Sequence, residues 1–184
     1  MRLAVPDMKT LRPAALLALC LVLAASCAQT RGQLAGERPR TVAVLVRNEA
    51  ERPQAGGLLE DFLGGQRPES LVAREAIRAL RGRGYRVVDA IPDPEHGVPS
   101  AEAWIRETRA DAALVIRLER MDVSALKAIG QAEIDLEASL VDAKGAILWS
   151  RSRRGPTLPQ TYRAQADWSA HLRMALGQLL GELP

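Results

Sequence analysis

The chain has 184 residues with a formal net charge of +3 at pH 7, and aromatic residues make up only 3% of it. No basic stripe with interleaved aromatic residues is present, which excludes nucleic acid as an expected partner. Three basic residues, Arg2, Lys9 and Arg12, lie near the N-terminus. The rest of the chain is therefore close to neutral, and its charge points to no particular partner.

Residues 1–26 have the three parts of an export signal: a basic start, an apolar run and small residues before a cleavage site. The apolar run extends from Ala14 to Ala25. It is shorter than the roughly 20 apolar residues that a helix needs to span a bilayer. We therefore expect a leader that is removed, with translation starting at either Met1 or Met8.

Residues 23–27, Leu-Ala-Ala-Ser-Cys, close this leader. They resemble the lipobox of bacterial lipoproteins, in which a signal peptidase cleaves before a lipid-modified cysteine. The resemblance implies that Cys27 carries a diacylglycerol and a palmitate-type acyl chain. Ala28 follows the cysteine where enteric inner-membrane lipoproteins often have aspartate, so the resemblance favours the outer membrane and a domain facing the periplasm. An ordinary secretory signal with a coincidental cysteine is the alternative.

The second cysteine, Cys20, lies inside the leader, so no intramolecular disulfide is expected in the mature chain. Residues 27–40 lack apolar periodicity and are predicted to form a flexible tether. Residues 41–184 are then long enough for a single globular domain.

The first part of this domain has the pattern strand, helix, strand. Residues 41–46 form an apolar, β-branched run that is typical of a buried strand. A helix is predicted from Pro68, with Ser70 as its cap and Gly82 near its end. Residues 85–89 predict a second strand. This order favours parallel pairing of the two strands through a right-handed crossover.

The second part predicts an antiparallel hairpin and a closing helix. Ser100 is expected to cap a short helix, residues 111–116 begin a third strand, and residues 131–140 alternate as a half-buried strand does. The turn at 142–145 predicts a hairpin with 147–149, while Pro156 and Pro159 interrupt regular structure. An apolar stripe, expected to lie across the sheet, runs through Trp168, Leu172, Ala175, Leu176, Leu179 and Leu183.

The predicted fold class is an α/β two-layer sandwich: a mixed sheet of about five strands, with helices mainly on one face and a C-terminal amphipathic helix. This order of elements, with the run Leu-Val-Asp-Ala-Lys-Gly-Ala-Ile-Leu-Trp at 140–149, resembles a group of envelope proteins. The group includes the curli-export lipoprotein CsgG, the LpoB activator of peptidoglycan synthases and the TolB amino-terminal domain. The resemblance implies a non-enzymatic accessory or adaptor subunit of an envelope assembly or transport complex.

Two features of the sequence complicate this resemblance. Residues 46–48, Val-Arg-Asn, stand where the group more often has a proline and an aromatic residue before asparagine. Residues 114–183 are also similar to auxiliary lipoproteins of lipid-trafficking ABC transporters. That second resemblance implies a protein that binds a lipid or another small ligand.

No hydrolase or phosphate-loop motif is present, so we expect neither enzymatic activity nor a cofactor. Asp93, Glu95 and His96 could be imagined as metal ligands, but a solvated turn is the simpler interpretation, and no metal is expected. His171, on the closing helix, is interpreted as a surface residue or a packed, hydrogen-bonded one.

The expected partner is another envelope protein or a second copy of the chain, with the membrane reached through Cys27. The candidate surfaces are the polar face of the 131–139 strand, the long loop that follows the first strand, and the arginines near 151. The residues assigned to them are Arg47, Asn48, Glu133, Asp135, Glu137, Arg151 and Arg153. The three acidic residues share one strand face, where either acid/base chemistry or simple solvation could explain them.

Overall fold

The structure is a computed structural model that describes residues 34, 37–50, 67–88, 97–159, 161 and 166–184. The chain divides into two compact units, Met1–Gln33 and Leu34–Pro184. The leader and Cys27 lie outside the described residues. All the hydrophobic residues that form the described core lie between Val42 and Leu183, so the second unit contains its own core.

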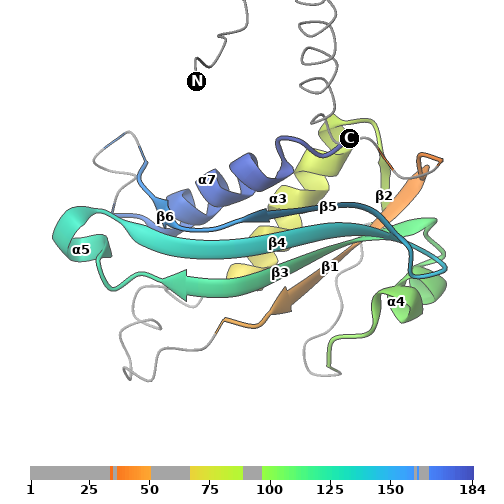
Figure 1. Cartoon of the computed structure of the whole chain (residues 1–184), viewed down its shortest axis with the longest axis horizontal. Helices are drawn as coiled ribbons and strands as arrows, with labels where there is room; N and C mark the ends of the chain where they lie inside the picture. The colour runs from red at the N-terminus through yellow and green to blue at the C-terminus, as the bar shows by residue number, and fades with distance from the viewer. Residues whose placement is uncertain (1–33, 35–36, 51–66, 89–96, 160, 162–165) are drawn as a thin grey trace, which may run out of the picture. The chain divides into compact units, whose positions relative to one another are not determined.

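A mixed sheet of six strands forms the centre of this unit (Figure 1). The strand order is β2-β1-β3-β4-β5, and β6 pairs with β4 beside β5. The predicted parallel pairing of β1 with β2 is confirmed, and β1 is also parallel to β3. The predicted hairpin is confirmed by the antiparallel pairing of β4 with β5. The strands are β1 (Thr41–Asn48), β2 (Arg86–Val88), β3 (Ala112–Asp122), β4 (Ala132–Asp142), β5 (Ile147–Arg153) and β6 (Pro156–Thr157).

Two long helices, α3 (Pro68–Gly82) and α7 (Trp168–Leu180), cover one face of the sheet. Both have an apolar side, and the alternation along β1 and β4 turns Val42, Val44 and the even-numbered residues of β4 toward them. The main core lies between these two layers. The apolar stripe of α7 is buried there, as its spacing predicts.

The shorter helix α4 (Ala101–Thr108) packs on the opposite face, over the beginning of β1 and β3 (Figure 1). Trp104 and Ile105 of α4 meet Ala43 and Leu45 of β1 in a second, smaller core. The indole N–H of Trp104 also donates a hydrogen bond to the carbonyl oxygen of Val44, at 3.0 Å. The helices are thus mainly on one face, in agreement with the predicted sandwich.

The structure corrects two local predictions. Ser70 does not cap α3: Arg67 occupies the N-cap position, Pro68 follows it, and no side chain caps the helix. Proline suits this position because its missing N–H would be unsatisfied there. Pro156 does not interrupt the sheet, because with Thr157 it forms the short edge strand β6, where a missing N–H is tolerated.

The structure also continues strands beyond the residues named for them and adds one short helix. The third strand continues to Asp122, past a register shift between Leu118 and Arg120. A one-turn helix, α5 (Leu126–Ile129), joins it to β4. The expected strand at 147–149 continues to Arg153. In contrast, Ser100 caps α4 as predicted, because its side chain accepts a hydrogen bond from the backbone N–H of Ala103.

Candidate functional site

The odd-numbered residues of β4 point away from α3 and α7, because side chains alternate along a strand. Glu133, Asp135 and Glu137 are therefore on the face of the sheet that α4 covers only at one end. Arg117 of β3 is the direct neighbour of Glu137. We define the open face as the residues that share this side of β1, β3, β4 and β5: Arg47, Arg117, Arg120, Asp122, Glu133, Asp135, Glu137, Ser139, Ser150 and Ser152.

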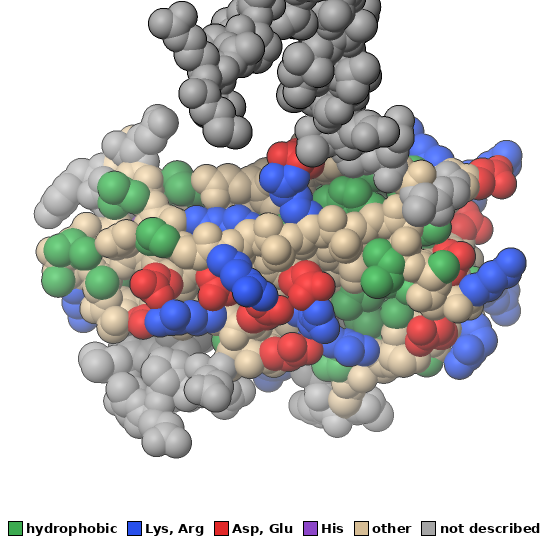
Figure 2. Space-filling model, in the orientation of Figure 1, with side chains coloured by type: hydrophobic (Ala, Val, Ile, Leu, Met, Phe, Trp, Pro, Cys, Tyr) green, Lys and Arg blue, Asp and Glu red, His purple; other side chains and the backbone are tan. Residues whose placement is uncertain are grey.

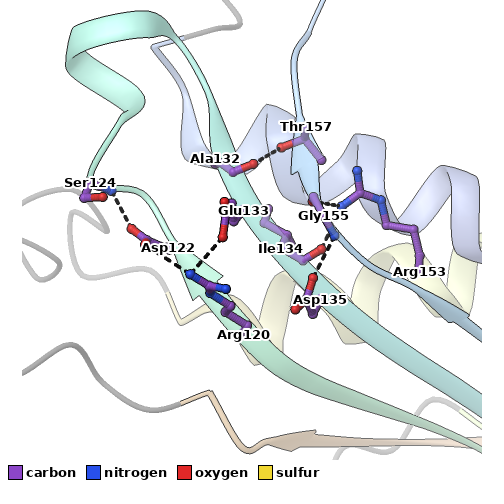
Figure 3. Close-up of polar contacts among 10 residues, drawn as sticks. All are labelled: Arg120, Asp122, Ser124, Ala132, Glu133, Ile134, Asp135, Arg153, Gly155 and Thr157. Carbon is purple, nitrogen blue, oxygen red and sulfur yellow. Dashed lines mark hydrogen bonds and ion pairs between the residues drawn. The ribbon is translucent and has the colours of Figure 1, made fainter.

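Acidic and basic side chains form pairs across the open face (Figure 3). Arg120 contacts Glu133 at 2.8 Å and Asp122 at 3.7 Å. Their side chains remain partly exposed, at 56% for Arg120 and 47% for Glu133. The backbone N–H of Ser124 donates to the Asp122 carboxylate and holds the pKa of that group below its ordinary value. These pairs neutralise one another and remain available to solvent.

A shorter contact joins Arg117 and Glu137, whose nitrogen and oxygen atoms lie 2.5 Å apart. The hydrogen bond to Glu137 raises the pKa of Arg117 above its ordinary value, and Coulombic attraction to the same carboxylate adds to the effect. In space-filling form the face shows basic and acidic side chains interleaved across the centre of the sheet (Figure 2). The arrangement is suited to recognition by charge pairing, since the paired charges of Arg117, Arg120, Glu133 and Glu137 remain accessible.

Of the seven residues predicted to form a partner surface, the structure brings four together. Glu133, Asp135 and Glu137 lie along β4, and Arg47 of β1 is aligned with Arg117 on the same face. Arg47 donates to the carbonyl oxygen of Pro99, at 3.3 Å, while its buried Nε atom has no hydrogen-bond partner among the described residues. Asp135 accepts a hydrogen bond from the backbone N–H of Gly155, at 2.8 Å (Figure 3).

The other three predicted residues lie away from the open face. Asn48 donates to Glu69 of α3, at 2.6 Å. Arg151 and Arg153 are aligned with Ala138 and Leu136 of β4, whose side chains point toward α3 and α7. The register, which the sequence does not show, separates these residues from the acidic residues of β4.

Arg153 has a structural environment that the sequence did not indicate. Its guanidinium group donates to the carbonyl oxygens of Ile134, at 2.7 Å, of Pro156, at 2.6 Å, and of Gly155, and its Nε donates to Gln178 of α7. Burial lowers the pKa of Arg153, while the nearby Asp135 acts in the opposite direction. The side chain therefore holds β4, the turn after β5 and α7 together.

A second buried polar group joins β6 to α7. Thr157 and His171 are both almost completely buried. The Thr157 hydroxyl donates to the carbonyl oxygen of Ala132, at 3.0 Å, and lies 2.7 Å from Nδ1 of His171. Nδ1 also lies 3.1 Å from the carbonyl oxygen of Thr157, which only accepts, so Nδ1 carries the proton. His171 is thus the packed, hydrogen-bonded residue of the two alternatives given by the sequence.

No group of three or more His, Cys, Asp or Glu side chains within the described ranges could hold a metal ion. No helix in the same ranges is long and apolar enough to cross a membrane. Asp93, Glu95 and His96, the imagined metal ligands, lie outside the described residues, as does Cys27.

The unit is an α/β sandwich of a kind known from bacterial proteins. No family model and no curated protein matches the sequence. Among solved structures, the chain is similar to a point variant of PelC from Paraburkholderia phytofirmans, described as a dodecamer. The match has 19% identity and a TM-score of 0.52, and it covers 84% of this chain and 95% of that one.

A second similar structure is the lipoprotein GNA1162 from Neisseria meningitidis. It has 19% identity and a TM-score of 0.46, with 67% of this chain and 84% of that one covered. At this level of identity, the likeness to PelC shows the fold of the unit. The resemblance to CsgG, LpoB and the TolB amino-terminal domain stays a prediction.

Proposed function

We propose that this protein is a lipid-anchored envelope protein whose folded unit acts as a non-enzymatic accessory or adaptor subunit. The observation that carries the proposal is the lipobox-like ending of the leader at Cys27, only seven residues before Leu34. Leu34 packs against the main core and belongs to the folded unit. A lipid on Cys27 would therefore keep this unit beside the bilayer, on the periplasmic side of the outer membrane.

The open face is the surface that we assign to a protein partner. Its charges are paired within the chain but exposed, so a partner can exchange them for its own charges at small cost. The serines of β5, Ser150 and Ser152, are exposed on the same face and add hydrogen-bonding groups. A surface of this kind favours specific but reversible contacts over a permanent apolar interface.

A second copy of the chain is the partner that we propose to test first. The likeness in fold to PelC supports this choice, because that protein is described as a dodecamer. The open face contains both signs of charge, so it can be complementary to another surface of the same molecule.

A photo-crosslinking experiment in cells tests the adaptor role. A photoreactive residue at Ser152, exposed on the open face, is expected to trap another envelope protein or a second copy. The matched control is the same residue at Gln178, which is exposed on α7. Equal trapping from both positions, or none from either, would contradict the assignment. Bound lipid found by solvent extraction and mass spectrometry would instead favour the transporter-auxiliary function.

A further inference from the structure

One end of the folded unit is the place where the chain enters it. The N-terminal ends of the three parallel strands meet there: the backbone N–H of Arg86 donates to Arg40 at 3.0 Å, and that of Asp111 donates to Thr41 at 2.9 Å. The helix α3 also ends there, since Arg83, one residue beyond it, receives a hydrogen bond from Arg38. We call this region the entry end.

The entry end is rich in exposed arginine. The exposed carboxylates that share it are fewer, and one of them, Asp111, is already engaged by the backbone N–H groups of Arg40 and Thr41, at 3.0 and 2.8 Å. In the space-filling view, basic and acidic side chains both lie at the right-hand end, where β2 lies in Figure 1 (Figure 2). The exposed arginines are Arg38, Arg40, Arg81, Arg86 and Arg109, and the carboxylates are Glu37, Glu107 and Asp111.

The arginines elsewhere in the described unit differ, because carboxylates neutralise many of them. Ion pairs hold Arg78, Arg117, Arg120, Arg151, Arg154 and Arg173. Within the described ranges, no ion pair involves Arg40, Arg86 or Arg109. The entry end therefore has a local excess of positive charge in a folded unit that is otherwise nearly balanced.

Helix polarity explains only part of this excess. Cations stabilise the C-terminal end of a helix, which accounts for Arg81 in the last turn of α3. Arg40 and Arg86 lie instead at the beginnings of β1 and β2, where no helix end requires them. Arg38 also has a local role, since its guanidinium group lies 4.5 Å from the centre of the Tyr85 ring.

The position of the proposed anchor would bring the entry end close to the membrane. Leu34 follows Cys27 by seven positions, and the chain between these two residues reaches about 25 Å at most when fully extended. The entry end is the part of the folded unit that follows this segment. We propose that the arginines of the entry end bind anionic phospholipid headgroups and so orient the folded unit on its membrane. This proposal rests on the anchored function proposed above.

Binding to vesicles tests the proposal without the anchor. Residues 28–184 contain the whole described core, and they lack both the leader and Cys27. This chain is expected to co-sediment with phosphatidylethanolamine vesicles that contain about one quarter phosphatidylglycerol, but not with phosphatidylcholine vesicles. Each basic residue near such a surface contributes about fivefold to partitioning, and high salt should reduce the binding.

The variant Arg40→Gln/Arg86→Gln/Arg109→Gln is expected to lose at least tenfold in binding. The matched control, Arg67→Gln/Lys127→Gln/Arg154→Gln, removes the same number of exposed charges from the opposite end of the strands and should bind like the parent chain. Circular dichroism and thermal unfolding verify that both variants are folded. Equal losses in the two variants, or equal binding to both kinds of vesicle, would overturn the proposal.

Two further outcomes separate this proposal from the anchored function. Residues 28–184 could bind the vesicles while Cys27 of the full chain, isolated from cells, carries no lipid. That result would support the headgroup site and contradict the anchor. Lipid on Cys27 with no binding to anionic vesicles would contradict the headgroup site alone. Cross-linking of the entry-end arginines to a protein, without vesicle binding, would also overturn the lipid assignment.

Discussion

Thr157 and His171 show how single residues hold the edge of the sheet to the last helix. The Thr157 hydroxyl donates to Ala132 and accepts from His171, and both side chains are buried. Thr157→Val keeps the shape of the side chain but removes its hydroxyl. The His171 N–H then has only the more distant Thr157 carbonyl oxygen of these two acceptors. We expect a loss of about 1–3 kcal/mol in the free energy of unfolding, measured with urea. Ser150→Ala, on the exposed side of β5, should change it by less than about 0.5 kcal/mol.

Arg153 and Arg154 are neighbours in the sequence but differ in their surroundings. Arg153 donates to three carbonyl groups, whereas Arg154 is exposed and contacts the Glu119 carboxylate, at 3.3 Å. Arg153→Met removes a charged donor from each of those carbonyl oxygens, so we expect it to destabilise the fold by about 2–3 kcal/mol. Arg154→Met should cost at most about 1 kcal/mol. Urea unfolding of the two variants compares them directly, and similar values would contradict the structural role of Arg153.

This difference between the two arginines could not be predicted from the sequence. A cluster of arginines after an exposed strand is usually solvated, and Arg154 fits that expectation. The role of Arg153 depends on the register of β5 against β4 and on the return of the chain at Gly155. Both are set by tertiary packing, which local sequence patterns do not encode.

At the scale of the element, the two serines predicted as helix caps provide a matched comparison. Ser100 caps α4, whereas Ser70 lies inside the first turn of α3 and caps nothing. Ser100→Ala is expected to lower the free energy of unfolding by about 1 kcal/mol. Ser70→Ala should leave it nearly unchanged or raise it slightly, since alanine is the better helix former. Equal losses in the two variants, measured by denaturant unfolding, would contradict the cap assignment.

The β4–β5 turn depends on one glycine. Gly145 has a φ of +81°, and an added Cβ would lie 3.1 Å from the Glu102 carboxylate of α4. Gly145→Ala is therefore expected to cost about 1 kcal/mol or more of unfolding free energy. Gly82→Ala, at the end of α3, meets nothing within 4 Å and should be neutral or stabilising. The melting temperature of Gly145→Ala should fall, and that of Gly82→Ala should stay the same or rise. A similar decrease in both variants would argue against strain at Gly145.

The elements themselves could largely be predicted because their patterns are strong. The alternation from Ala132 to Leu140 and the apolar stripe of α7 each indicate one buried side, and the structure confirms both. Residues 111–116 predict only the beginning of β3, because charged residues replace the apolar run after Ile116. The charged residues begin where α4 no longer covers the sheet. The strand therefore continues, but one of its faces becomes exposed to solvent.

At the scale of the whole molecule, the sandwich was predictable from the order of its elements, whereas the grouping of the site residues was not. Alternation alone brings Glu133, Asp135 and Glu137 to one face. Arg47 lies on the same face as these acidic residues, whereas Arg151 and Arg153 lie on the other face. Both facts depend on which strands are neighbours and on their register. The entry end likewise unites arginines from four separate segments of the chain, and no local pattern predicts that.

The central claim is that a lipid on one sulfur atom holds this molecule at its membrane. The most direct test is the intact mass and N-terminal peptide of the protein isolated from membranes of cells that express the full chain. We predict a chain that begins at Cys27, with the mass of a diacylglycerol and acyl groups on that residue, and we predict that Cys27→Ser abolishes both the modification and the membrane association. A chain that begins at another residue, or an unmodified Cys27 in a protein that still fractionates with membranes, would contradict the account.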